Sequence, residues 1–272
     1  MKPCSFDYMR ADTAAEAVEC LAQFGDDARV LAGGQSLMPI LNMRLAQPRL
    51  LLDISRTREL DYVRLQQTRL CIGAAATQAS VEWRPTLAAE VPLLHSAFPN
   101  ISHFQIRNRG TVCGSVAHAD PSAELPLVLL ALGGDVVLRS ARGRRVVMAH
   151  DFFRGLLQTA RGADEMIEEV RYPLARTGER HAFIEFTSRQ GDFAIVAVAV
   201  VAGPGGIDVA VGGVADRPRL KRLPLARGAA LEHALNDFAW ELEAQDDAHA
   251  SAKLRRHLVR CLGCRAIQQA IA

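Results

Sequence analysis

The sequence lacks any apolar run of the length that crosses a membrane. Its longest apolar runs, residues 125–132 and 194–202, fall well short of the roughly 20 residues that a membrane-spanning helix needs. The first ten residues, MKPCSFDYMR, contain no apolar segment of the kind found in signal peptides. We therefore expect a cytoplasmic protein without a membrane span.

An excess of charge of one sign is also missing. The formal net charge is +2, and 23% of the residues are charged, as in ordinary soluble proteins. A nearly neutral chain has no electrostatic reason to bind nucleic acid or another polyanion. We therefore expect no nucleic-acid partner.

Cysteine is sparse, and its spacing argues against a metal site built by this chain alone. Six cysteines are scattered over 272 residues, and only Cys261 and Cys264 form a close C-x-x-C pair. A four-cysteine zinc or iron–sulfur site needs a second close pair, and no set of His, Cys and Asp residues has metal-ligand spacing. We expect reduced thiols and no metal in this chain, so any iron–sulfur cluster would belong to another chain.

Familiar catalytic and nucleotide-binding motifs are absent as well. Neither G-x-G-x-x-G nor G-x-x-x-x-G-K-[ST] occurs. Nothing resembles a nucleophile with its base, so the sequence predicts no catalytic side chain. A nucleotide, if bound, must be held by another arrangement.

What the chain does contain is enough apolar sequence for two or three compact units. Helical periodicity occurs at residues 14–24 and 120–132, and strand patterns occur at 50–54, 61–75 and 135–148. The second and third strand patterns each read as a hairpin. This mixture predicts an α+β protein.

A polar, turn-rich stretch at residues 173–180 separates these elements from a last domain. There, strand patterns precede helical ones. The strands are expected at 182–188, 192–202 and 207–212, and the helices at 224–235, 238–243 and 250–270.

The stretch RVLAGGQSLMPILNMRLA, residues 29–46, is the most informative part of the chain. It reads as the end of a strand, a tight turn at Gly33-Gly34, and a helix with Ser36 as its N-cap. Glycine lets a phosphate oxygen approach the backbone, and free N–H groups at a helix N-terminus suit an anion. Alone, however, such a pair of glycines usually indicates an ordinary turn.

A second small-residue stretch, TVCGS at residues 111–115, favours the phosphate interpretation. It supplies hydroxyl groups and is expected to turn tightly. Two such turns can hold the two phosphates of a diphosphate, which fits a dinucleotide better than a mononucleotide. Further on, Asp120 and Pro121 are expected to begin a helix.

Two segments, AGGQSLMPILNMRLAQPRLLLDI and QIRNRGTVCGSVAHADPSAELP, resemble the FAD-binding segments of the medium subunits of molybdenum hydroxylases. This is the family of the carbon monoxide dehydrogenase and xanthine dehydrogenase medium subunits. Residues 183–196 and the closing RRHLVRCLGCRAIQQA resemble the family's C-terminal domain. The resemblance covers the whole chain, and the two glycine segments together make it specific.

The resemblance implies an α+β fold with an FAD site of the vanillyl-alcohol-oxidase (PCMH) type. Residues 1–175 would form the FAD-binding domain, with subdomains at about 1–55 and 56–175. Residues 176–272 would form a C-terminal domain with a three-stranded antiparallel sheet and helices. FAD would lie between the two domains.

By position, the resemblance also assigns residues to the cofactor site. The two turns would wrap opposite sides of the diphosphate. Ile101 would supply an apolar contact, Glu124 a carboxylate that accepts a hydrogen bond from the cofactor, and Ile167, Glu185 and Phe193 match positions near the flavin ring. The residues of the two turns are Ala32, Gly33, Gly34, Gln35, Ser36, Thr111, Val112, Cys113, Gly114 and Ser115.

Three of these residues depart from the family pattern. Cys113 replaces the first of two usual glycines, and its Cβ is tolerated well only if φ is negative. Gln35 often corresponds to histidine, and both can donate a hydrogen bond. Glu185 stands where some relatives carry a lysine near the ring, a change expected to shift the flavin potential.

Roles other than cofactor binding stay open for several residues. Phe193 is as well suited to core packing as to a ring contact, and Glu124 is assigned to the cofactor only through the resemblance. Arg107 and Arg109 are interpreted as solvated arginines.

The resemblance implies a redox relay subunit. Substrate would be oxidised at a molybdenum cofactor in a large subunit, and electrons would pass through [2Fe-2S] clusters of a small subunit to FAD and an external acceptor. Such complexes are usually dimers of heterotrimers. Two alternatives are a stand-alone flavin-dependent NAD(P)H oxidoreductase, active without partners, and a non-catalytic nucleotide-binding assembly module, which would purify colourless.

Overall fold

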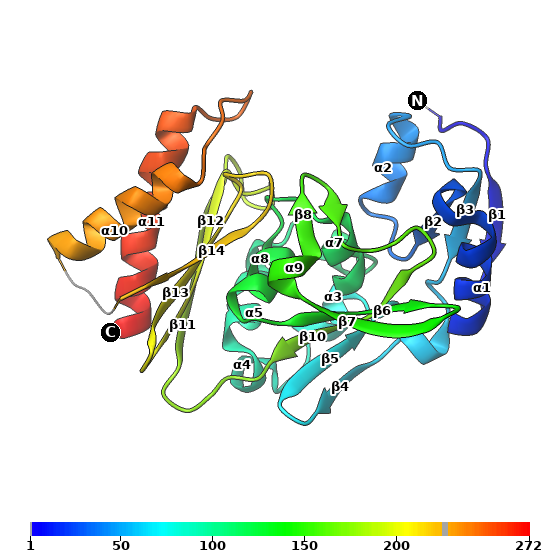
Figure 1. The fold of residues 1–272 in the computed structure, drawn as a ribbon, viewed down its shortest axis with the longest axis horizontal. Helices are drawn as coiled ribbons and strands as arrows, with labels where there is room; N and C mark the ends of the chain where they lie inside the picture. The colour runs from blue at the N-terminus through cyan, green and yellow to red at the C-terminus, as the bar shows by residue number, and fades with distance from the viewer. Residues whose placement is uncertain (1, 225–227) are drawn as a thin grey trace.

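The computed structural model describes residues 2–224 and 228–272. Three main sheets follow one another along the long axis of the molecule (Figure 1). The N-terminal sheet lies at one end, a five-stranded sheet lies in the middle, and the C-terminal sheet with its helices lies at the other end. Within these residues, no helix is both long and apolar enough to span a bilayer.

The N-terminal sheet is small and parallel. Its central strand, β3, pairs with β1 on one side and β2 on the other. Thr13 caps the predicted helix at residues 14–24 by accepting a hydrogen bond from the Glu16 N–H at 3.1 Å. The elements are β1 (Asp7–Arg10), α1 (Ala14–Phe24), β2 (Ala28–Leu31), α2 (Leu37–Asn42) and β3 (Leu50–Asp53).

The middle sheet is antiparallel, with strand order β4-β5-β10-β6-β7. The two predicted hairpins are confirmed as β4–β5 and β6–β7, and the long strand β10 joins them. The elements of this part are β4 (Val63–Gln66), β5 (Arg69–Gly73), α3 (Gln78–Glu82), α4 (Leu87–Glu90), α5 (Pro92–Ala97), α6 (Phe104–Arg107), α7 (Val112–His118), α8 (Glu124–Ala131), β6 (Asp135–Ser140), β7 (Gly143–Met148), α9 (Ala149–Phe152), β8 (Phe153–Gly155), β9 (Gln158–Thr159) and β10 (Met166–Pro173).

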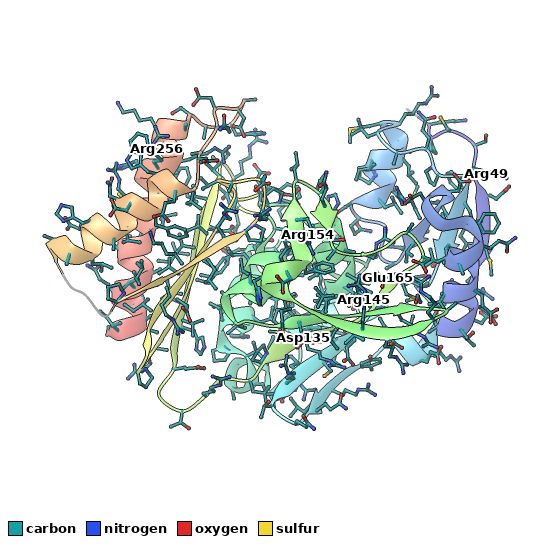
Figure 2. The ribbon with its side chains drawn as sticks, in the orientation of Figure 1. Arg49, Asp135, Arg145, Arg154, Glu165 and Arg256 are labelled. Atoms are coloured by element: carbon teal, nitrogen blue, oxygen red, sulfur yellow. The ribbon has the colours of Figure 1, made fainter. Side chains whose placement is uncertain are left out.

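Buried carboxylates in and before β10 are paired with arginines from neighbouring strands. Arg145 on β7 donates two hydrogen bonds to Glu165, each 2.6 Å long (Figure 2). These bonds hold the pKa of Glu165 below its usual value. Arg139 on β6 likewise donates to Glu168 at 2.9 Å. Because each buried charge has a partner, acidic residues can occupy the centre of the sheet.

The C-terminal sheet has four antiparallel strands, one more than predicted. The additional strand, β14, lies at the edge beside β13. Its sequence RLKRL is rich in basic residues, as edge strands often are. The elements are β11 (Arg180–Phe186), β12 (Val196–Gly203), β13 (Gly206–Gly212), β14 (Arg219–Leu223), α10 (Ala229–Glu241) and α11 (Ala252–Ile271).

Several predicted boundaries are wrong. The single helix α10 replaces the helices predicted at 224–235 and 238–243, and residues 225–227 of the first lie outside the described residues. The segment at 111–115 is not a turn, because helix α7 begins at Val112. The helix predicted from residue 120 begins at Glu124, because the Asp120 carboxylate accepts the Ser122 N–H at 2.9 Å and forms a turn.

The C-terminal sheet is apolar on both faces. Ala197 and Ala199 belong to the core shared with the middle part of the chain, whereas Val196 and Val198 belong to a second core under α10 and α11. Alternate residues of a strand point to opposite faces. The sheet therefore packs against the middle part of the chain with one face and against α10 and α11 with the other (Figure 1).

Candidate functional site

The first small-residue turn joins β2 to α2. A Cβ added to Gly33 would overlap the Arg109 carbonyl oxygen and lie 2.7 Å from Gly110 Cα. Because both atoms belong to the backbone, only glycine fits there. Gly34 has a φ of +71°, a conformation that favours glycine. The two glycines are therefore required for different reasons.

The contact at Gly33 brings the two predicted segments together. Gly110 directly precedes Thr111, the first residue of the second segment. The Gln78 N–H donates to the Gly110 carbonyl at 2.7 Å, and Thr77 pairs with Thr111 in an isolated bridge. The segments 32–36 and 111–115, far apart in sequence, thus lie next to each other in the fold.

The second segment begins helix α7. Thr111 Oγ1 accepts a hydrogen bond from the Gly114 N–H at 3.0 Å. A Cβ on Gly114 would lie 2.6 Å from this oxygen, so a larger residue there would have to displace the Thr111 side chain. Val112 is buried and Ser115 is half-buried.

Cys113 is accommodated because it lies in a helix. Its φ is negative, as expected within α7. The thiol faces the Ile72 carbonyl, with 3.4 Å between Sγ and O, and the side chain is buried. Burial raises the pKa of the thiol far above its usual value. The replacement of glycine therefore leaves the local backbone unstrained.

The polar side chains of the first turn have different roles. Gln35 Nε2 donates to the Gly33 carbonyl at 2.8 Å, so this side chain braces its own turn. Ser36 occupies the predicted N-cap position of α2, but its side chain makes no capping hydrogen bond. The half-buried Ser36 hydroxyl is therefore available to a ligand, and Ala32 beside the glycines is also half-buried.

Ile101 is fixed by an arginine. Arg107 Nη1 donates to the Ile101 carbonyl at 2.7 Å, while Nε and Nη2 bind Glu82 at 2.7 and 3.0 Å. The Arg107 side chain is only 11% exposed. The interpretation of Arg107 as a solvated residue is therefore wrong. Its role is to hold the backbone around the buried Ile101.

The chain after Ile101 contacts the loop that carries Phe193. A Cβ on Gly191 would lie 2.8 Å from His103 Cε1, so the imidazole packs directly on this glycine. The Phe193 side chain is 62% exposed, which argues against a role in core packing. His103 thus links the predicted contacts Ile101 and Phe193.

Phe193 also lines a cleft of about 1150 Å³ between the start of α8 and loops of the C-terminal part. Pocket volumes of this order accommodate small-molecule ligands. The other walls come from residues 120–122, 213–217 and 242–249, together with Arg255.

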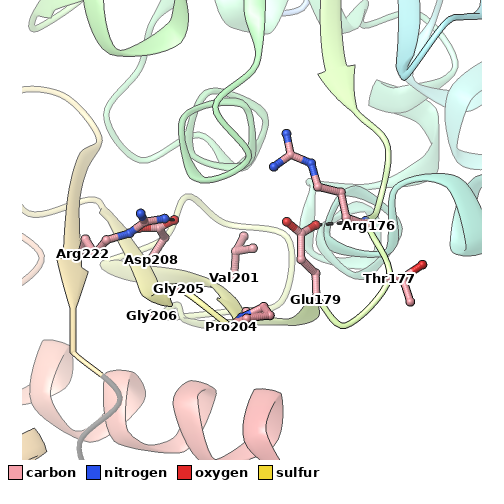
Figure 3. Close-up of a pocket in the computed structure, with 10 residues that line it drawn as sticks. Arg176, Thr177, Glu179, Val201, Pro204, Gly205, Gly206, Asp208 and Arg222 are labelled. Carbon is pink, nitrogen blue, oxygen red and sulfur yellow. Dashed lines mark hydrogen bonds and ion pairs between the residues drawn. The ribbon is translucent and has the colours of Figure 1, made fainter.

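A smaller cleft of about 260 Å³ lies at the β12–β13 turn (Figure 3). Two of its charged side chains pair with each other, and a third accepts a backbone hydrogen bond. Arg222 donates to Asp208 at 2.6 and 2.8 Å, and the Arg176 N–H donates to Glu179 at 3.0 Å. It includes none of the predicted site residues, and we assign it no part in the site.

Glu124 is a buried acid, and Glu185 is a half-buried one. Glu124 begins α8 and is 6% exposed, and burial raises its pKa to about 7. Glu185 lies on β11, where burial and the charge of Glu124 raise its pKa to about 8. Both predicted contacts therefore have raised pKa values.

Ile167 stands apart from the other predicted residues. It lies on β10 opposite Leu138 of β6, is 5% exposed, and packs in the large core. It does not line the cleft beside Phe193. In the part of the chain that the structure describes, no group of three or more His, Cys, Asp or Glu residues could hold a metal ion.

The sequence interpretation missed the backbone that completes the site. Arg109 and Gly110 form the wall against Gly33, and His103 supports the Phe193 loop. Only Gly110 gave a local signal, because it ends the basic segment before Thr111.

The arrangement fits the diphosphate of FAD. Two backbone segments meet where a Cβ is excluded, and the Ser36 hydroxyl beside them is not used by the fold. Close approach of backbone N–H groups to an anion is what such a glycine-lined wall permits.

Comparison with known proteins shows the family to which the chain belongs. A family model described as the FAD-binding domain in molybdopterin dehydrogenase matches residues 4–175. Caffeine dehydrogenase subunit beta from Pseudomonas sp. (strain CBB1) is 41% identical over 204 residues, which are 75% of this chain and 69% of that protein.

Two other similarities extend over nearly the whole chain. The glyceraldehyde dehydrogenase medium chain of Sulfolobus acidocaldarius is 34% identical over 282 residues, 99% of each chain. A structure of carbon monoxide dehydrogenase from Hydrogenophaga pseudoflava, which lacks the Mo-pyranopterin moiety of its cofactor, has a TM-score of 0.93. It is 32% identical and the match covers 99% of this chain and 98% of that one.

The family match, over residues 4–175, includes both glycine segments, and the full-length matches also include the C-terminal sheet and helices. Sequence, geometry and relatives agree on FAD as the cofactor. This chain belongs to the FAD-binding medium subunits of molybdenum hydroxylases, and it is an oxidoreductase subunit.

Proposed function

We propose that this chain is the electron-transfer subunit of a molybdenum-containing hydroxylase or dehydrogenase complex. A large subunit with the molybdenum cofactor oxidises the substrate. Electrons pass from [2Fe-2S] clusters of a small subunit through the FAD of this chain to an external acceptor. The complex is a cytoplasmic dimer of heterotrimers, and FAD lies between residues 1–175 and 176–272.

The contact of Gly33 with the backbone of Arg109 and Gly110 carries the proposal. It places the two predicted diphosphate segments against one another without an intervening side chain. The family match covers both segments. Both observations support a diphosphate site formed by these two segments.

The names of the relatives support a substrate site in another subunit. One relative belongs to a caffeine dehydrogenase and another to a glyceraldehyde dehydrogenase. Caffeine and glyceraldehyde differ greatly in size and polarity, although both relatives are similar to this chain over long segments. A common electron-transfer role explains this better than a shared substrate pocket.

When bound, FAD accepts electrons singly and can release them in pairs. The residues of this chain bind and position it. The two glycine segments hold the diphosphate, Ile101 and Phe193 supply apolar contacts, and Glu124 accepts a hydrogen bond. No side chain here acts as acid or base on the substrate.

The relay is tested by removing FAD from the purified complex and then restoring it. We expect substrate to bleach the iron–sulfur absorbance of the FAD-free complex, because the molybdenum cofactor and the iron–sulfur clusters, which precede FAD in the relay, are intact. Reduction of the external acceptor is lost, and added FAD recovers it. Untreated complex is the control.

Two outcomes contradict the relay. Undiminished acceptor reduction by the FAD-free complex would show that electrons leave by another route. NADH turnover by this chain with FAD but without partners would favour the stand-alone oxidoreductase.

Ser36→Ala and Thr111→Ala separate ligand binding from folding within the site. Thr111→Ala removes a helix cap, so we expect it to lower the free energy of unfolding by about 0.5–2 kcal/mol. Ser36→Ala removes a hydroxyl that caps no helix, so its unfolding free energy stays within about 0.5 kcal/mol of wild type. FAD affinity falls by about tenfold in Ser36→Ala, as for one lost hydrogen bond.

Chemical denaturation without FAD and FAD titration of the same preparations measure both effects. Unchanged FAD affinity in Ser36→Ala would remove this hydroxyl from the site. A fall in its stability as large as that of Thr111→Ala would show that the hydroxyl serves the fold.

A further inference from the structure

The N-terminal end of helix α3 is fixed to the second glycine segment. The Gln78 N–H donates to the Gly110 carbonyl at 2.7 Å, and Thr77 pairs with Thr111 in an isolated bridge. Gln78 is only 6% exposed, and a Cβ on Gly110 would lie 3.3 Å from its side-chain amide. Gly110, whose Cα packs against Gly33, is therefore also packed against α3.

The C-terminal end of α3 is fixed to the chain around Ile101. Glu82, the last residue of α3, accepts hydrogen bonds from Arg107 Nε at 2.7 Å and from Nη2 at 3.0 Å. The remaining nitrogen, Nη1, donates to the Ile101 carbonyl at 2.7 Å and to the Ser102 carbonyl at 3.1 Å. The Arg107 and Glu82 side chains are 11% and 16% exposed. Because a guanidinium presents its N–H groups in fixed directions, the carboxylate determines where the two carbonyls are held.

Ser102, directly after Ile101, has a strained backbone. Its φ is +42°, a conformation that residues with a side chain adopt rarely. Such a conformation persists only where the surrounding structure holds it. Here one Arg107 hydrogen bond ends on the carbonyl before the Ser102 Cα and another ends on the carbonyl after it. The arginine therefore restrains the turn that presents Ile101.

We propose that α3 is a scaffold that sets the separation between the diphosphate segment at Thr111 and the apolar contact at Ile101. Glu82 and Arg107 are the positioning residues of this scaffold, and neither side chain touches FAD. Glu82 orients the guanidinium of Arg107, which in turn holds Ser102 in the conformation that FAD binding requires. The inference rests on the function proposed above, because that function assigns both ends of the segment to the cofactor.

A second ion pair of the same kind provides the structural comparison. Arg84 donates from Nε and Nη2 to Glu90, at 2.6 and 2.9 Å. The two side chains are 24% and 11% exposed, so the pair resembles that of Glu82 and Arg107 in geometry and burial. Within the described residues, neither of its side chains bonds to a predicted cofactor contact. Loss of either arginine removes one such pair, but only loss of Arg107 also releases the turn at Ser102.

FAD titration of the full-length chain, together with chemical denaturation of the FAD-free protein, tests the scaffold. We expect Arg107→Met to weaken FAD binding by about tenfold or more, because the turn at Ser102 relaxes. Arg84→Met is the control and binds FAD like the wild type, although both arginine variants lose stability. Glu82→Gln weakens FAD binding in the same direction but by less, because its amide keeps one acceptor oxygen for the guanidinium.

Glycine at position 102 provides a rescue that a merely structural ion pair would not show. Glycine adopts a positive φ without the penalty of a Cβ. We therefore expect Ser102→Gly to raise the FAD affinity of Arg107→Met several-fold. The same substitution has a smaller effect in the otherwise wild-type chain, where the arginine already holds the turn. Comparison of the two backgrounds measures the coupling between Ser102 and Arg107.

Two results overturn the scaffold and leave the proposed function standing. Arg107→Met could bind FAD as tightly as Arg84→Met does, or Ser102→Gly could change the affinity equally in both backgrounds. If Arg107→Met does not fold, Glu82→Gln takes its place, and wild-type FAD affinity in that variant overturns the scaffold. A wild-type chain that binds no FAD would overturn the proposed function and the scaffold with it.

Discussion

Gly33→Ala is expected to weaken FAD binding by about 100-fold or more. The added Cβ overlaps the Arg109 carbonyl and lies 2.7 Å from Gly110 Cα. Neither atom belongs to a flexible side chain, so one of the two segments must move away from the other. Overpacking of this kind costs about 1–3 kcal/mol, and the diphosphate would lose the geometry of both segments at once. FAD titration of the purified variant measures the effect.

Gly205→Ala is the matched control. A Cβ at Gly205, in the β12–β13 turn, would meet no described atom within 4 Å, and its φ lies outside the left-handed region. We expect wild-type FAD affinity and stability. If Gly33→Ala binds FAD as tightly as Gly205→Ala does, the two glycine segments do not form the diphosphate site.

Arg255→Met is expected to lower the unfolding free energy by about 2–5 kcal/mol. The buried guanidinium donates to the Ile195 carbonyl at 2.9 Å, to the Gly213 carbonyl, and to Asp247 at 2.5 Å. Its loss leaves two carbonyls unpartnered between the Phe193 loop and α11. The Asp247 carboxylate is 49% exposed, so the ion pair itself contributes less than the carbonyl bonds.

The neighbouring Arg256→Met provides the comparison. Arg256 lies on the outer side of α11 with its guanidinium 4.1 Å from the centre of the Trp240 ring (Figure 2). Loss of a partly exposed cation–π contact costs about 0.5–1 kcal/mol. Thermal unfolding of both variants should therefore show a clearly larger loss for Arg255→Met. Equal losses would contradict the assignment of Arg255 as the link between the Phe193 loop and the C-terminal helix.

The sequence predicted correctly the helices and hairpins whose caps, turns and apolar faces lie within a few consecutive residues. The helix α1 has a cap and an apolar face within eleven residues, and both hairpins of the middle sheet have turn residues between apolar runs. Strand β10 escaped prediction because Glu168, Glu169 and Arg171 disguise a buried strand. The two acids are tolerated because Arg139 and Arg64, on other strands, pair with them, and no local pattern shows such pairing.

The candidate site shows the same division. The glycine segments and Ser36 were evident from residue type and spacing, together with the resemblance. The reason that position 33 must be glycine was not evident, because the backbone that Gly33 contacts belongs to Arg109 and Gly110, far away in the sequence. The effect of Cys113 depended on the sign of φ, which the start of α7 decides.

The most direct test of the account is the flavin content of the protein purified with its partners. A visible absorption spectrum is recorded, and the released chromophore is identified by chromatography. The account predicts about one FAD per chain, accompanied by iron–sulfur absorbance from co-purifying subunits. A colourless protein that cannot be reconstituted with FAD, alone or with its partners, would contradict it and leave the nucleotide-binding assembly module.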